Sequence, residues 1–125
     1  MDSTGSGSEF PRTSVSGMPR IGPRRELKRA LEAYWSGRVG AGELAEAGSS
    51  VRRANWEAMA RHHIDLIPSN DFSLYDQVLD AAVLVGAVPP RYLPAAGAAG
   101  LDSYFAMARG GMIAGNQLEP LQLTK

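Results

Sequence analysis

Basic side chains gather in the stretch PRIGPRRELKR, residues 19–29, where a helix is expected to begin. The cluster consists of Arg24, Arg25, Lys28 and Arg29. A helix N-terminus already carries a partial positive charge, so cations placed there are unfavourable unless an anion joins them. The free N–H groups of the first turn and the converging cations favour a carboxylate or a phosphate. The alternative is a solvated basic face of an amphipathic helix, and composition alone does not choose between the two.

A second set of polar side chains follows the apolar run IDLIP, residues 64–68. In an α/β fold, residues just beyond the C-terminal end of a strand commonly face the ligand, so this set is a candidate binding site. The alternative is structural, with Ser73 capping a helix and the preceding residues forming a turn. The set comprises Asn70, Asp71, Ser73, Tyr75 and Asp76.

The sequence contains no recognisable catalytic motif. The GxSxG, P-loop and HExxH patterns do not occur in it. The adjacent pair His62 and His63 is a poor metal site, because neighbouring helix residues do not face the same way. A helix C-terminus, where a cation is mildly favoured, explains this pair better. We therefore predict neither catalytic residues nor metal ligands in this chain.

The bulk properties indicate one electrically neutral domain. The chain has 125 residues, with 13 basic and 13 acidic side chains and a formal net charge of zero, which argues against a nucleic-acid partner. The absence of cysteine excludes disulfides and thiolate metal ligands. The most apolar stretch, residues 81–88, is far shorter than the roughly 20 residues that cross a bilayer, and no secretory signal opens the chain. We therefore expect a cytoplasmic protein with no membrane partner.

Hydrophobic periodicity predicts the elements that would position these residues. Apolar residues at helical spacing predict helices over residues 23–36, 42–62, 74–86 and 101–109. The third has so broad an apolar arc that we expect burial on more than one face. Short apolar runs predict strands at residues 15–18 and 64–68, and LQLT could begin another; residues 89–100 and GGMIAGN are expected to be loops. This order is typical of an α/β protein, mostly helical, with about three short parallel strands.

Residues 1–14 form a Gly/Ser-rich segment with almost no apolar content. Such a segment cannot bury enough surface to offset the entropy that ordering costs, so we expect it to be disordered. It reads as a native leader or as a tag, and in either case it lies outside the expected domain, residues 15–125.

Five segments follow one another along this domain: GMPRIGPRRELKRALEAYWSG, IDLIPSNDFSLYDQVLD, GAVPPRY, LDSYFAMARG and LQLTK. In this order they resemble cobalamin-independent methionine synthase, the 5-methyltetrahydropteroyltriglutamate–homocysteine methyltransferase family. The resemblance implies a methyltransferase that moves the methyl group of 5-methyltetrahydrofolate polyglutamate to homocysteine and forms methionine.

The resemblance also implies a fold and a binding site. The family's enzyme has two (β/α)8 barrels, and its zinc ion is held by His, Cys, Glu and Cys residues of the C-terminal barrel, so no cofactor is expected in this chain. The family's folate-binding RELK motif falls on Arg25, Glu26, Leu27 and Lys28, and a further folate-contacting lysine falls on Lys125. A run of glutamates in the ligand is a polyanion, and the basic cluster at the start of the helix would attract it.

The chain departs from the family pattern in sequence and in length. GMPR stands for GFPR, and QLTK stands for EMTK, which removes a carboxylate beside Lys125. Because one barrel requires about 250 residues, we expect residues 15–125 to be an N-terminal fragment of the first barrel, a partial (β/α)8 (TIM) barrel that is inactive alone. Its last strand would be an unpaired edge prone to self-association. The alternative is a helical module that uses the basic helix, residues 24–36, on nucleic acid or an acidic partner.

Overall fold

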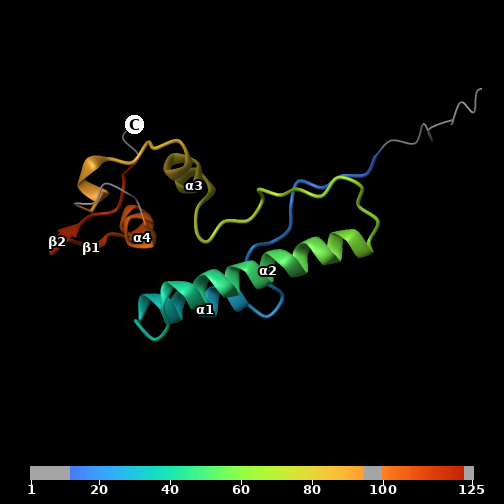
Figure 1. Ribbon diagram of the computed structural model, residues 1–125, viewed down its shortest axis with the longest axis horizontal. Coiled ribbons are helices and arrows are strands. Elements are labelled where there is room, and N and C mark those ends of the chain that lie inside the picture. Colours follow the sequence, from blue (N-terminus) through green and yellow to red (C-terminus); the bar gives the residue numbers. More distant parts are fainter. Residues whose placement is uncertain (1–11, 95–99, 123–125) are drawn as a thin grey trace, which may run out of the picture. The chain divides into compact units, whose positions relative to one another are not determined.

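The computed structural model describes residues 12–94 and 100–122. Most of the expected leader and the predicted ligand contact Lys125 therefore lie outside the described residues. The chain consists of two compact units, and the boundary between them lies between Phe72 and Ser73. The basic cluster lies in the first unit, around the start of helix α1 (Glu26–Trp35; Figure 1).

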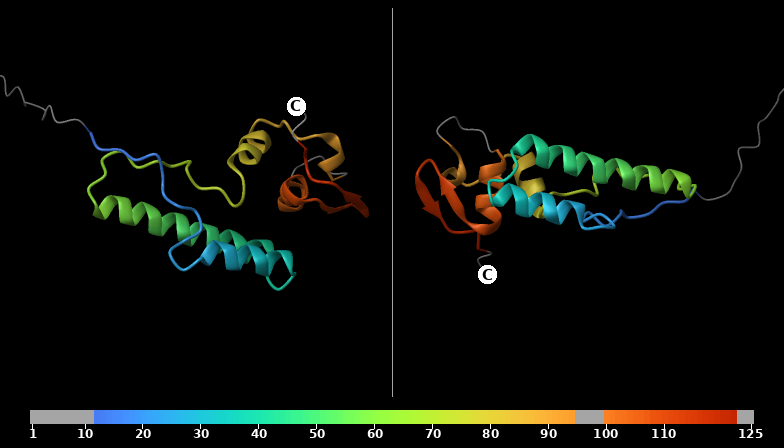
Figure 2. Two further views of the ribbon diagram at one scale, coloured as in Figure 1. Left: turned by 180° about the vertical axis from the view of Figure 1, so that it is seen from behind. Right: turned by 90° about the horizontal axis from the view of Figure 1, so that it is seen from below.

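Two helices, α1 (Glu26–Trp35) and α2 (Ala41–Arg61), lie side by side in the first unit (Figures 1 and 2). The short connection of residues 36–40 makes them antiparallel neighbours. Each helix turns one apolar stripe inward, because its buried residues recur at helical spacing. Both predicted helices are confirmed, with small shifts at their ends. The buried residues are Leu27, Leu31, Leu44, Gly48, Val51 and Met59.

The two strands predicted in this unit are wrong. In place of a ladder, the structure has one isolated parallel bridge between Ser14 and Leu66, and the Leu66 N–H donates to the Thr13 carbonyl at 2.9 Å. The Asp65 carboxylate accepts the Thr13 N–H at 2.8 Å and the Thr13 hydroxyl at 2.9 Å. The Asp65 side chain thus accepts the Thr13 N–H, a backbone donor that a longer ladder would need. Leu66 is 49 % exposed, so the apolar run IDLIP is not a buried strand.

The second unit contains α3 (Gln77–Leu84), a 3-10 turn η1 (Pro90–Tyr92), α4 (Leu101–Arg109), and the strands β1 (Gly111–Ile113) and β2 (Asn116–Leu118). The strands pair in antiparallel fashion, with Met112 opposite Gln117, and β1 packs against α4 (Figure 1). The prediction of a helix at residues 101–109 is confirmed. Its inner face builds the core of the unit, whose buried members are Tyr92, Ala106, Met107 and Ile113.

The hairpin between β1 and β2 replaces the loop predicted for residues 110–116. The two residues that connect the strands, Ala114 and Gly115, have φ angles of 49° and 83°. A two-residue turn with both φ angles positive matches the right-handed twist of paired strands, and asparagine or glycine normally occupies its first position. An alanine there hides the hairpin from a sequence analysis based on turn residues.

Replacing Ala114 by asparagine should raise the free energy of unfolding by about 0.5–1 kcal/mol, because asparagine tolerates the left-handed conformation better than alanine. Urea denaturation measures the change. Ala87→Asn is the matched control, since Ala87 is exposed in a connection and does not have a positive φ; its effect should stay within about 0.5 kcal/mol. A destabilised Ala114→Asn variant would contradict the turn.

Helix α3 begins later than predicted and is less buried. The Asp76 carboxylate accepts the Leu79 N–H at 2.9 Å, so Asp76 caps the helix and Ser73 does not. The exposed fractions of Val78, Leu84 and Val85 are 76 %, 81 % and 75 %, which contradicts burial on more than one face. The apolar arc is broad, but within its unit only Leu79 and Val83 pack against the core.

The predicted fold class, a partial (β/α)8 barrel with about three short parallel strands, is wrong. The described residues form four α-helices and one two-stranded antiparallel sheet. Short apolar runs do not distinguish a strand from an irregular connection, and only partner strands would have stabilised one. The argument for self-association through an open parallel edge therefore has no basis in this fold. No helix among the described residues has the length and apolar character that crossing a membrane requires.

Candidate functional site

A tight turn brings the basic cluster to the start of α1. The Arg25 N–H donates to the Gly22 carbonyl at 3.1 Å, and the Leu27 N–H donates to the Ile21 carbonyl at 3.0 Å. Arg25 takes the N-cap position in a left-handed conformation, with φ 62° and ψ 35°. This conformation costs a residue other than glycine about 1 kcal/mol. The helix therefore begins at Glu26 rather than at Pro23, with a strained cation immediately before it.

Glu26 is used within the turn. Its Oε2 accepts the Arg24 N–H at 2.9 Å, and its Oε1 lies 3.2 Å from Arg24 Nε. Hydrogen bonds from its own backbone N–H, and then from Arg24, lower the pKa of the Glu26 carboxyl below its ordinary value of 4.5. Gly22, with φ 86°, lies against this carboxylate, and a side chain at that position would collide with it. Glu26 thus holds the turn in shape.

Two other cations of the cluster have partners in the helix or directly before it. Lys28 Nζ lies 3.5 Å from Glu32 Oε1, an i,i+4 pair in which both side chains are about half exposed. Such a pair contributes only a few tenths of a kcal/mol, so a ligand carboxylate can compete for Lys28. Arg29 Nη2 donates to the Arg24 carbonyl at 2.6 Å. The Lys28–Glu32 pair was readable from its spacing in the sequence, whereas the Arg24–Glu26 pair depends on the turn.

Arg25 differs from these cations. Its side chain is exposed, and within residues 12–94 and 100–122 it makes no hydrogen bond or ion pair. Arg25 is the N-cap and Lys28 is N3, two positions that are neighbours across the first turn of a helix. The two cations can therefore hold two oxygen atoms of one anion, although the Leu27 N–H of this turn already donates to the Ile21 carbonyl.

The four RELK residues therefore have different surroundings. Leu27 is fully buried, with 0 % of its surface exposed, and its place is in the core. Glu26 is tied to Arg24, while Arg25 and Lys28 face solvent. Lys125, the other residue implied by the resemblance, lies outside the described residues. Contact of any of these side chains with a folate stays a prediction.

The polar set of residues 70–76 is occupied by structural hydrogen bonds. Asp71 Oδ2 accepts the Met18 N–H at 2.9 Å. The Ser73 hydroxyl, which is 2 % exposed, accepts the Tyr75 N–H at 3.1 Å. Together with the cap formed by Asp76, these bonds favour the structural interpretation of the set over a binding site.

Cation–π stacking is a feature that the sequence analysis missed. The Arg52 guanidinium lies 5.4 Å from the centre of the Trp56 ring and 5.9 Å from that of Phe72. The i,i+4 spacing of Arg52 and Trp56 on one helix could have predicted the first of these contacts. The contact joins the end of the first unit to α2 and needs no ligand.

The described residues do not fit the zinc ion that the resemblance implies for the family. The sequence has no cysteine, and the described side chains contain no group of three or more His, Asp or Glu residues that could hold a metal ion. His62 and His63 lie at the C-terminal end of α2, where the His63 carbonyl accepts the Thr13 hydroxyl at 3.0 Å.

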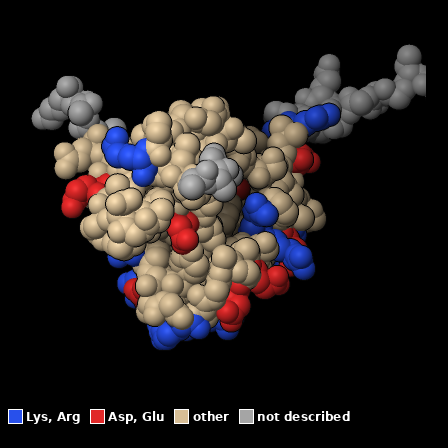
Figure 3. All heavy atoms as spheres, turned by 60° about the vertical axis from the view of Figure 1, so that its left-hand side comes forward, with Lys and Arg blue, Asp and Glu red and all other residues tan. Residues whose placement is uncertain are grey.

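The surface charges are mixed in sign. On the face shown in Figure 3, Lys and Arg atoms lie beside Asp and Glu atoms instead of forming a broad basic surface. This face therefore does not present the broad basic surface that is typical of a nucleic-acid interface.

Comparison with known proteins identifies the family. Residues 12–125 match the family described as cobalamin-independent synthase, N-terminal domain. The chain is 52 % identical, over 90 % of its length, to the 5-methyltetrahydropteroyltriglutamate–homocysteine methyltransferase of Mycobacterium tuberculosis H37Rv. The identities to the same enzyme of Streptomyces coelicolor and Flavobacterium johnsoniae are 51 % and 50 %, each over 91 % of the chain. The match spans only 14–15 % of the length of these relatives. The resemblance inferred from the sequence motifs is thus confirmed, and the chain belongs to the cobalamin-independent synthase family, as part of its N-terminal domain.

Proposed function

We propose that the start of α1 binds the glutamate chain of a folate polyglutamate, as part of a methyltransferase that makes methionine from homocysteine. The relatives are named for a triglutamate substrate, 5-methyltetrahydropteroyltriglutamate, whose tail is a run of carboxylates. The observation that carries the proposal is Arg25, an exposed cation held in a strained conformation directly before α1. Strain of this kind is retained most often where it serves binding.

In this proposal each residue of the motif has a different role. Arg25 and Lys28 would pair with ligand carboxylates from neighbouring positions of the first turn. Glu26 keeps the turn closed by holding Arg24, and Leu27 anchors the helix in the core. None of these groups performs the methyl transfer, which in this proposal belongs to the full-length enzyme with homocysteine and zinc.

The proposal predicts that the chain prefers a triglutamate to a monoglutamate. A triglutamate carries two more carboxylates, and each exposed ion pair contributes about 0.2–1 kcal/mol, so the dissociation constant should be about 2- to 30-fold lower. Isothermal titration with 5-methyltetrahydropteroyltriglutamate and its monoglutamate at low salt measures the ratio. The preference should shrink as salt is raised, because exposed charges are screened.

The Arg25→Glu variant reverses the charge of this side chain and should abolish the preference for the triglutamate. Arg38→Glu is the matched control, since Arg38 is an exposed arginine beyond the other end of α1 and the change in charge is the same. Arg25→Gly should also lose the preference, while its free energy of unfolding stays equal or rises by up to about 1 kcal/mol, because glycine relieves the left-handed strain. Equal loss in the Arg25→Glu and Arg38→Glu variants, or equal affinity for the two folates, would refute the site.

A further inference from the structure

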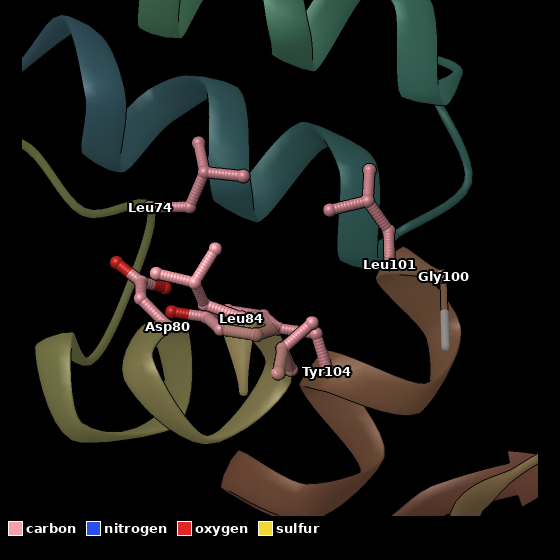
Figure 4. Close-up of a pocket in the computed structure, with 7 residues that line it drawn as sticks. Leu74, Asp80, Leu84, Gly100, Leu101 and Tyr104 are labelled. Atoms are coloured by element: carbon pink, nitrogen blue, oxygen red, sulfur yellow. The ribbon is translucent and has the colours of Figure 1, made fainter. Parts of the chain in front are cut away.

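A separate cavity lies within the second unit, between α3, the start of α4 and the segment before α3. It has a volume of about 420 Å³, within the range that holds small organic ligands. Figure 4 shows leucine side chains around this space, with the oxygen atoms of Asp80 and Tyr104 on one side of it. The main lining residues are Leu74, Val83, Leu84, Leu101, Asp80 and Tyr104.

The Tyr104 hydroxyl is committed to the surrounding structure. It accepts the Asp76 N–H at 2.8 Å and donates to the Asp76 carbonyl at 3.1 Å, and it lies 3.4 Å from the Ser73 hydroxyl. Burial, and to a lesser extent the nearby Asp80 carboxylate, raises the pKa of Tyr104 above its ordinary value of 10.0. Tyr104 therefore stays neutral at physiological pH and fixes one wall of the cavity.

Asp80 is the one ionisable carboxyl group among the lining residues. No Lys, Arg or His in the described part of the chain forms an ion pair with it within 4.0 Å. The rest of the lining is mainly apolar side chains, and a carboxylate beside apolar surface is most favourable when a cation joins it. The cavity thus presents an apolar surface and one negative charge at its edge.

We propose that this cavity binds a small organic cation, with an ammonium group on the Asp80 carboxylate and an apolar body against Leu74, Leu84 and Leu101. The ligand class is opposite in charge to the polyglutamate assigned to the start of α1. The two sites lie in different units and use no residue in common, so either can fail without the other.

A titration with simple probes tests this site in the full chain. The probes are 2-phenylethylammonium, the neutral 2-phenylethanol and the anion phenylacetate, which share an aromatic body and differ in charge. Two-dimensional ¹H–¹⁵N NMR spectra should show saturable shifts of the amides at residues 79–84 and 101–104 with the ammonium probe. Its dissociation constant should be about three- to fivefold lower than that of the alcohol, and phenylacetate should bind more weakly than either.

Two variants separate charge from apolar contact. Asp80→Asn should raise the dissociation constant of the ammonium probe about three- to fivefold, to that of the alcohol, while Glu119→Gln, an exposed charge removal in the same unit, should leave it unchanged. Leu84→Ala should weaken all three probes alike, and the fold should survive because Leu84 is 81 % exposed. Equal binding of the cation and the anion, or shifts scattered away from the cavity, would overturn the proposal even if Asp80→Asn failed to fold.

Discussion

Replacing Leu27 by alanine is expected to lower the free energy of unfolding by about 2–5 kcal/mol. Leu27 is fully buried on the inner face of α1, so the truncation removes apolar contacts and leaves a cavity that the neighbouring helix cannot fill completely. Urea denaturation followed by circular dichroism measures the loss. The prediction concerns function as well, because Leu27 lies inside the RELK motif and would support Arg25 and Lys28 without touching the ligand.

Leu84→Ala makes the matched control for this experiment. The substitution is identical, but the Leu84 side chain is 81 % exposed, so the change should stay within about 0.5 kcal/mol. Leu27→Met, which nearly conserves volume, should cost less than about 1.5 kcal/mol and should keep the preference for triglutamate. If Leu27→Met folded normally but lost that preference, Leu27 would be a ligand contact and the division of roles proposed for the motif would be wrong.

Replacing Gly110 by alanine is expected to cost at least about 2 kcal/mol. Gly110 ends α4 with φ 77° and ψ 167°, a region of backbone conformation that is essentially restricted to glycine. A Cβ atom there would lie 2.8 Å from the Leu118 carbonyl oxygen and 3.2 Å from Pro120 Cδ. Because backbone atoms cannot move aside cheaply, both the strain and the collision must be relieved by displacing the hairpin from α4.

Two other glycines calibrate this measurement. Gly115 has a positive φ of 83° but open space around its Cα, so Gly115→Ala should cost only about 1 kcal/mol, from backbone strain alone. Gly42 lies in α2 with no neighbour within 4 Å of an added Cβ, and Gly42→Ala should raise the free energy of unfolding by about 0.5–1 kcal/mol. A Gly110→Ala variant no less stable than Gly115→Ala would show that the close approach to Leu118 is absent in solution.

Local patterns in the sequence were sufficient for the helices and for the family. The apolar spacing in α1 and α2 and the periodic residues of α4 specify helices, because one stripe on each must leave water. The ordered motifs likewise identified the cobalamin-independent synthase family, which the comparison then confirmed. Both inferences depend on short segments, within each of which the residues lie close together in the chain.

The tertiary structure alone decided the features that depend on distant partners. Whether IDLIP becomes a strand depends on a neighbouring strand, and the Asp65–Thr13 bonds interrupt that pairing after a single bridge. Among the described residues the Arg25 side chain has no partner, whereas Lys28 pairs with Glu32. Residue type could not predict this difference, because the left-handed turn places Arg25 at the N-cap and Glu32 lies one turn beyond Lys28. Composition and spacing determine what a segment can form, and the energy of long-range contacts determines which of those forms is occupied.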